Sequence, residues 1–155
     1  MLSQFNRLSQ EEHEFMYKAP ILVAILIAGA DGNIDRKEIQ EGIVQAKKRQ
    51  RMASLELKEI YGEIEEDFED KLKIVLQSYP VEASQRNPMI VEELARLNTV
   101  FPKLDRDFAA QYYQSICDLA MKVAQSSGGL LGIKSVGHAE AVYVKLPMLK
   151  NPSAL

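Results

Sequence analysis

Apolar residues recur every three or four positions along most of this chain, which is the spacing that gathers side chains on one face of an α-helix. Ser9 and Glu12 form the capping-box pattern that begins a helix, and the residues after them predict a helix to about Gly29. Pro20 lies inside this segment, so we expect a kink or a division into two shorter helices. Beyond Pro20 the segment is apolar on nearly every side, which predicts a helix at the centre of the domain.

A turn and a second helix follow this segment directly. Asp31-Gly32 favours a turn, because glycine accepts positive φ and the aspartate carboxylate bonds to nearby backbone amides. Asp35 and Glu38 repeat the capping-box spacing, so a helix should begin there and end in the basic run 47–51. The apolar positions of this helix are spaced four and three residues apart: Ile39, Ile43 and Ala46.

The middle of the chain carries a longer apolar face. It continues through residues 54–78 and predicts one long helix with Ser54 as its cap. Six carboxylates between Glu63 and Asp70 interleave with this face, so they should form a solvated helix surface. A polar connection with prolines should cover 81–88, and a shorter helix should follow over about 90–101.

The last third of the chain predicts two further helices. One should run from about 105 through 123, and a last, shorter one should cover about 139–149. The serine- and glycine-rich stretch 126–132 separates them. No segment shows sustained alternation of apolar and polar residues, so we expect an all-α, single-domain bundle of six to seven helices. This domain should span 1–150, with 151–155 as a C-terminal tail.

The composition is that of an ordinary globular protein and excludes several classes. The chain has 155 residues and a net charge of −3, which gives no overall attraction to nucleic acid. One cysteine excludes an intrachain disulfide and the paired-cysteine zinc patterns, and we expect a soluble, cytoplasmic protein. The apolar run Pro20–Ala30 is too short for a transmembrane segment, which takes about 20 residues. Acidic residues before this run argue against a signal peptide.

Oxygen-bearing side chains gather at the turn between the first two predicted helices. Asp31, Asn33 and Asp35 match the start of an EF-hand calcium loop. The match then fails, because that loop needs glycine at its sixth position and glutamate at its twelfth, where this chain has Arg36 and Gly42. Two interpretations stay open. One is a shorter oxygen site for a hard divalent cation, and the other is a turn and helix cap that need no metal.

The stretch Ala24–Glu38 resembles the signature of the TerB-like (tellurite-resistance protein B-like) family. The shared elements are a small-residue helix end, Ala-Asp-Gly, a hydrophobic residue, an aspartate, and a glutamate three positions later. The resemblance implies a small all-helical bundle with an internal pseudo-repeat. A weaker second copy is visible, since 120–128 is similar to the first part of that stretch and 136–140 to its second part. Ser127 stands where the first copy has Asp31.

The resemblance also implies where a metal would bind. The carboxylates that carry over are Asp31, Asp35 and Glu38, with Glu140 as the counterpart in the second half. A divalent ion such as Ca²⁺, Mg²⁺ or Zn²⁺ would be the cofactor. The family is associated with stress and tellurite resistance and with membrane-associated complexes, and the resemblance implies no catalysis.

Two functions follow for this chain. The first is a non-enzymatic protein of stress or tellurite resistance, in which carboxylates hold a divalent cation and rigidify the turn. The second is a metal-free protein-interaction or oligomerisation module, whose partner is another protein or a second copy. An enzyme, the third alternative, would need a pocket with convergent polar groups, for instance around His138 and Glu140. Neither a nucleophile elbow nor a P-loop occurs in the sequence.

Overall fold

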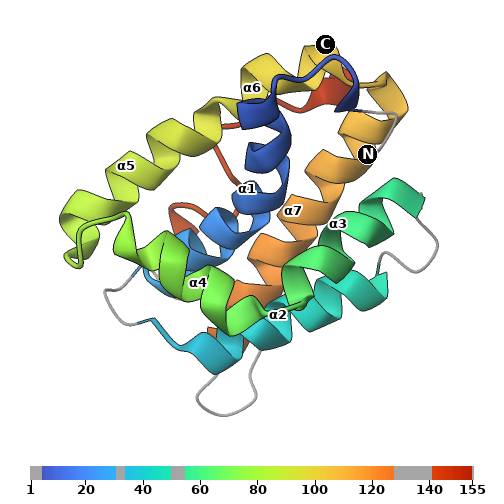
Figure 1. Cartoon of the computed structure of the whole chain (residues 1–155). Coiled ribbons are helices and arrows are strands. Elements are labelled where there is room, and N and C mark those ends of the chain that lie inside the picture. The colour runs from blue at the N-terminus through green and yellow to red at the C-terminus, as the bar shows by residue number, and fades with distance from the viewer. Residues whose placement is uncertain (1–4, 31–33, 50–54, 128–140, 155) are drawn as a thin grey trace.

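The computed structural model describes residues 5–30, 34–49, 55–127 and 141–154. Helices make up the regular secondary structure of these residues, which contain no strand, so the all-α prediction is confirmed. The elements, shown in Figure 1, are α1 (Gln10–Ala28), α2 (Arg36–Arg49), α3 (Leu55–Glu65), α4 (Phe68–Gln77), α5 (Ala83–Ala95), α6 (Leu97–Val100), the 3-10 helix η3 (Phe101–Lys103), α7 (Arg106–Ser127) and the 3-10 helix η4 (Pro152–Ala154).

Helix α1 lies at the centre of the bundle, as its nearly uniform hydrophobicity predicts (Figure 1). It packs against α2, α3, α4, α5 and α7, and every residue from Ala19 through Gly29 is buried. The buried apolar side chains of the described helices join one hydrophobic cluster around it. In the described part of the chain, no helix combines the length and the hydrophobicity needed to cross a membrane.

Pro20 does not divide α1, which continues unbroken on both sides of it. Proline has no backbone N–H, so the carbonyl four residues earlier, that of Met16, loses its partner within the helix. The buried hydroxyl of Tyr112 on α7 donates to this carbonyl oxygen at 2.8 Å instead. Because the carbonyl keeps a hydrogen bond, one helix continues through Pro20, so of the two expected outcomes, a kink or a division, the division into two helices is wrong.

The prediction of one long helix over 54–78 is also wrong, because α3 and α4 are separate helices. Asp67 lies between them at a φ of 53°, a left-handed conformation that aspartate tolerates better than most residues. The ammonium group of Lys71 donates to the carbonyls of Glu63 and Glu66 at the end of α3. The buried apolar face continues across this break, which is why the spacing of apolar residues could not reveal it.

Helix α5 begins inside the stretch 81–88 that we predicted as a polar connection, and it includes Pro88. That proline removes a hydrogen bond to the carbonyl of Ser84, but both residues are exposed, so water can take its place. The helix predicted over 90–101 is the later part of α5 together with α6.

The last described segment differs from the prediction as well. The helix expected over about 139–149 is absent from 142–149, which form turns, and Leu146 has a positive φ of 49°. Pro147 follows Leu146 and disfavours helical backbone there. In the expected tail 151–155, η4 packs against α7 and Pro152 is buried, so this part of the tail belongs to the domain.

Candidate functional site

Asp35 is the predicted metal ligand whose side chain the structure describes. It immediately precedes α2, it is exposed, and its Oδ1 accepts a hydrogen bond from the backbone amide of Lys37 at 2.9 Å. This is the bond by which an N-cap residue satisfies one of the free amides at a helix start. Asp35 therefore plays the structural role that the metal-free interpretation requires of it.

The other predicted ligands are not described to the same extent. Glu38 lies in the first turn of α2, but its side chain is outside the described part of the structure, and so are Asp31 and Glu140. Among the described residues, no group of three histidine, cysteine, aspartate or glutamate side chains is placed to hold a metal ion. Convergence of the four carboxylates on one cation stays a prediction.

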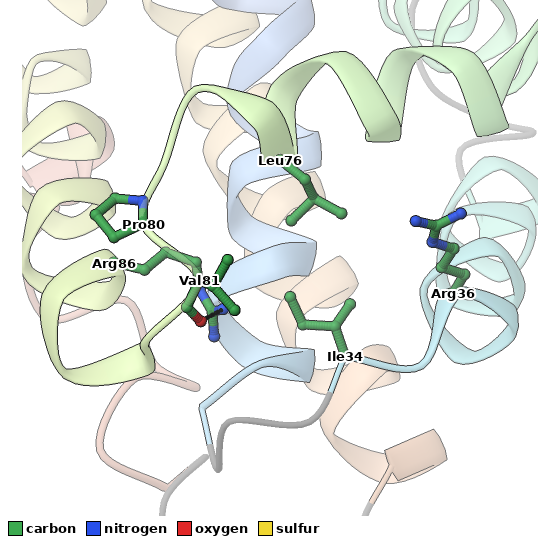
Figure 2. Close-up of a pocket in the computed structure, with 6 residues that line it drawn as sticks. All are labelled: Ile34, Arg36, Leu76, Pro80, Val81 and Arg86. Atoms are coloured by element: carbon green, nitrogen blue, oxygen red, sulfur yellow. Dashed lines mark hydrogen bonds between the residues drawn. The ribbon is translucent and has the colours of Figure 1, made fainter.

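A pocket of about 310 Å³ opens beside the start of α2, facing the α4–α5 connection (Figure 2). This volume is at the lower end of the range for small-molecule sites, roughly 300–1,000 Å³. Among the described residues that line it, four have apolar side chains and two are arginines: Ile34, Leu76, Pro80, Val81, Arg36 and Arg86. Figure 2 shows Arg86 and Pro80 on one side of the pocket and Arg36 on the other.

Arg86 is the buried polar residue of this pocket, with only 3% of its surface exposed. Its Nη1 donates to the carbonyl of Val81 at 3.0 Å and its Nη2 to the carbonyl of Gly29 at 2.7 Å. Gly29 is the C-cap of α1, where carbonyls lack partners within the helix and the helix dipole is negative. The guanidinium group of Arg86 thus caps the C-terminal end of α1.

Gly29 is needed for this close approach. A Cβ atom at this position would lie 2.6 Å from Nη2 of Arg86 and 2.9 Å from Cγ1 of Ile34. The backbone φ of Gly29 is −96°, which other residues also adopt, so the glycine is required for space and not for conformation. The small-residue helix end in the sequence therefore has a direct structural cause.

The guanidinium of Arg86 is not fully satisfied. Its Nε is buried and has no hydrogen-bond partner among the described residues. Burial lowers the pKa of Arg86, because desolvation disfavours its charged form, yet arginine remains protonated in proteins. No acidic side chain is among the described residues that line the pocket.

Our sequence interpretation missed Arg86, because it assigned the residue to a polar connection. A usable signal was present: Arg86 precedes Ile90 by four residues, and Ile90 precedes Leu94 by four. All three lie on the buried face of α5. Pro88 obscured this period, since an internal proline normally argues against a helix.

In comparisons with known proteins, no family model, no curated protein and no solved structure matches this chain. The resemblance to the TerB-like family therefore rests on the motif residues alone. Function must be inferred from the pocket and from the motif beside it.

Proposed function

We propose that this chain is a non-enzymatic interaction module of the TerB-like type, which binds a segment of a partner protein at the pocket between α2 and the α4–α5 connection. The observation that carries this proposal is the pocket itself, with its mostly apolar lining. Val81 at this pocket is 88% exposed. A partner that covered Val81 would remove this surface from water.

The chemistry of the lining residues supports binding over catalysis. General acid–base or nucleophilic catalysis needs a carboxylate, imidazole, thiol or hydroxyl that can exchange a proton or attack a substrate. The described lining residues supply aliphatic groups and guanidinium groups, and a guanidinium stays protonated at physiological pH. These described side chains can hold and orient a ligand, but none of them offers a group for proton transfer.

The motif supplies the family part of the proposal. Its small-residue helix end is explained by the contact of Gly29 with Arg86, so the motif and the pocket belong to one structural unit. On the resemblance, the module serves in stress or tellurite resistance as a cytoplasmic protein, including in complexes at a membrane surface.

Divalent-metal binding at Asp31, Asp35, Glu38 and Glu140 is our second candidate. The observation that favours it is the exposed carboxylate of Asp35 at the start of α2, on the turn that carries the motif. If a cation binds, millimolar Ca²⁺, Mg²⁺ or Zn²⁺ raises the melting temperature, and the double variant Asp31→Asn/Asp35→Asn abolishes the rise. An unchanged melting temperature with all three metals would exclude this candidate.

Selection of peptides from a random display library tests the interaction module, with EDTA present so that no metal contributes. We expect peptides that compete with one another for one saturable site. The variant Val81→Asp should weaken their binding at least tenfold. Leu55→Asp is the matched control, since Leu55 is 71% exposed and does not line the pocket. Failure to select any saturable peptide, or equal effects of both variants, would contradict the proposal.

A further inference from the structure

We propose that the pocket recognises a carboxylate that adjoins an apolar group on the partner protein, with Arg86 and Arg36 as the groups that bind the anion. This inference rests on the proposed interaction function and names the chemistry of the segment that is bound. The carboxylate belongs either to a chain terminus or to an aspartate or glutamate side chain.

The first support is the unfilled bonding capacity of Arg86. A guanidinium has five N–H donors, and the bonds to the Val81 and Gly29 carbonyls use two of them. The Nε–H is among the remaining donors and is buried without a partner in the described structure. A buried donor left unpaired costs about 1–3 kcal/mol, so an incoming acceptor would relieve a penalty that the free protein carries.

The second support is the position of Arg36. It is the first residue of α2, where the helix dipole is positive and disfavours a cation. Arg36 is exposed and lines the same pocket as Arg86, from the opposite side (Figure 2). An anion bound in the pocket would offset this unfavourable interaction with the helix dipole.

The third support is the balance of charge and hydrophobicity in the lining. The chain as a whole is acidic, with a net charge of −3, yet the described lining of this pocket carries two cations and no acid. Phosphate sites usually add side-chain hydroxyls, and no serine, threonine or tyrosine is among the described lining residues. Apolar walls beside a guanidinium suit a carboxylate with an aliphatic neighbour, such as a terminal leucine.

NMR titration of the full chain tests the inference, with the Arg86 Nε–H resonance and the methyl groups of Ile34, Leu76 and Val81 as reporters. N-acetyl-leucine supplies a terminal carboxylate, and the blocked dipeptide acetyl-Asp-Leu-amide supplies a side-chain carboxylate. N-acetyl-leucinamide is the neutral control, and inorganic phosphate tests for an unspecific anion site. We expect saturable shifts of all reporters with at least one carboxylate probe, and at least tenfold weaker binding of leucinamide and of phosphate.

Two variants show whether carboxylate binding depends on an arginine of the pocket or only on the net charge of the protein. Arg36→Gln removes an exposed guanidinium from the pocket and should weaken carboxylate binding at least fivefold. Arg7 precedes the N-terminal end of α1, a 19-residue helix whose other end contacts Arg86. Arg7→Gln removes the same charge far from the pocket, so the dissociation constant of the carboxylate probe should stay within twofold of the wild-type value. Both side chains are exposed, so neither variant should disturb folding.

Three results would overturn the inference: no shift of the Arg86 Nε–H, equal binding of N-acetyl-leucine and its amide, or equal effects of Arg36→Gln and Arg7→Gln. Failure here is distinguishable from failure of the proposed function. If library peptides bind Val81→Asp more weakly but bind Arg36→Gln as well as the wild type, the interaction module is supported and the anion site is contradicted. Binding of the carboxylate probes without any selectable peptide would contradict the interaction module, and would show that the two arginines bind a free carboxylate and not one on a partner protein.

Discussion

Single residues explain why the central helix survives an internal proline. The pair Tyr112–Met16 is 96 residues apart in sequence, so no local pattern could predict that a tyrosine hydroxyl replaces the missing amide of Pro20. The helix caps are the opposite case. Ser9 and Glu12 make both bonds of the capping box, and Asp35 caps α2, as their local spacing predicts. Bonds between near neighbours can be read from sequence, whereas bonds across the core need the fold.

Mutation can test whether the Tyr112 hydroxyl replaces the backbone amide that is missing at Pro20. Tyr112→Phe leaves the buried Met16 carbonyl unpaired, so it should lower the free energy of unfolding by about 1–3 kcal/mol. In a Pro20→Ala background the new backbone N–H can bond this carbonyl, and the cost of Tyr112→Phe should fall by about 1 kcal/mol. Denaturant unfolding of the four proteins in this cycle measures the coupling.

Tyr61→Phe is the control for this cycle, because Tyr61 is equally buried but donates at 3.0 Å to Ser115 Oγ, one turn of α7 beyond Tyr112, and not to the Met16 carbonyl. Its cost should be the same with Pro20 and with alanine at that position. An equal cost of Tyr112→Phe in both backgrounds would show that the hydroxyl does not replace the missing amide.

Helices were predicted correctly where one apolar side packs against the core. Helix boundaries and contacts between helices were predicted less well. The face shared by α3 and α4 was predicted correctly, but the break at Asp67 was not, since it depends on backbone conformation and on Lys71. Close contacts between helices are equally hidden. Gly42, one of the two residues that break the EF-hand pattern, is buried in α2 against α7.

Two glycines within helices should respond in opposite ways to alanine. A Cβ at Gly42 would lie 2.5 Å from Cγ2 of Val123, whose branched side chain has little freedom to move, so Gly42→Ala should destabilise the fold by about 1–3 kcal/mol. Gly62 in α3 has no atom within 4 Å of such a Cβ, and Gly62→Ala should stabilise by about 0.5–1 kcal/mol. Thermal or denaturant unfolding measures both, and a stabilising Gly42→Ala would contradict the close packing of α2 on α7.

An ion pair between α1 and α5 predicts a dependence on pH. Glu93 accepts hydrogen bonds from the hydroxyl of Tyr79 and, at 3.0 Å, from the ammonium group of Lys18. Burial opposes ionisation of Glu93, but these bonds outweigh burial and hold its pKa below the usual value. A lowered pKa in the folded state means stability that is present above the unfolded pKa and is lost as the pH falls through the folded one.

Glu93→Gln should therefore destabilise the protein by about 1 kcal/mol at neutral pH, since both partners are partly exposed. The difference from the wild type should shrink as the pH falls below about 4.5, where the unfolded carboxylate is protonated. Urea unfolding between pH 3 and 7 measures it. Glu92→Gln, at an exposed neighbouring position, is the control, and a difference for Glu93→Gln that does not change with pH would contradict the role of the ion pair.

At the scale of the whole molecule, the sequence predicted the class of fold but not the candidate site. The period of apolar residues predicted an all-helical bundle around a buried first helix, because burial on all sides requires an apolar surface on all sides. The pocket lies between the start of α2 and the α4–α5 connection. Arg86, which lines it, bonds to Gly29 at the end of α1, 57 positions away, and such a juxtaposition becomes visible only once the helices are packed.

The central claim is that the pocket lined by Arg36 and Arg86 is the surface on which a partner binds. Mapping of backbone and methyl chemical shifts over the full chain, with a selected peptide and EDTA present, tests this claim most directly. The largest shifts should cluster at Ile34, Leu76, Val81 and Arg86. Shifts centred instead on the smaller cavity beside Phe101 and Pro152, or shifts that require a divalent cation, would contradict it.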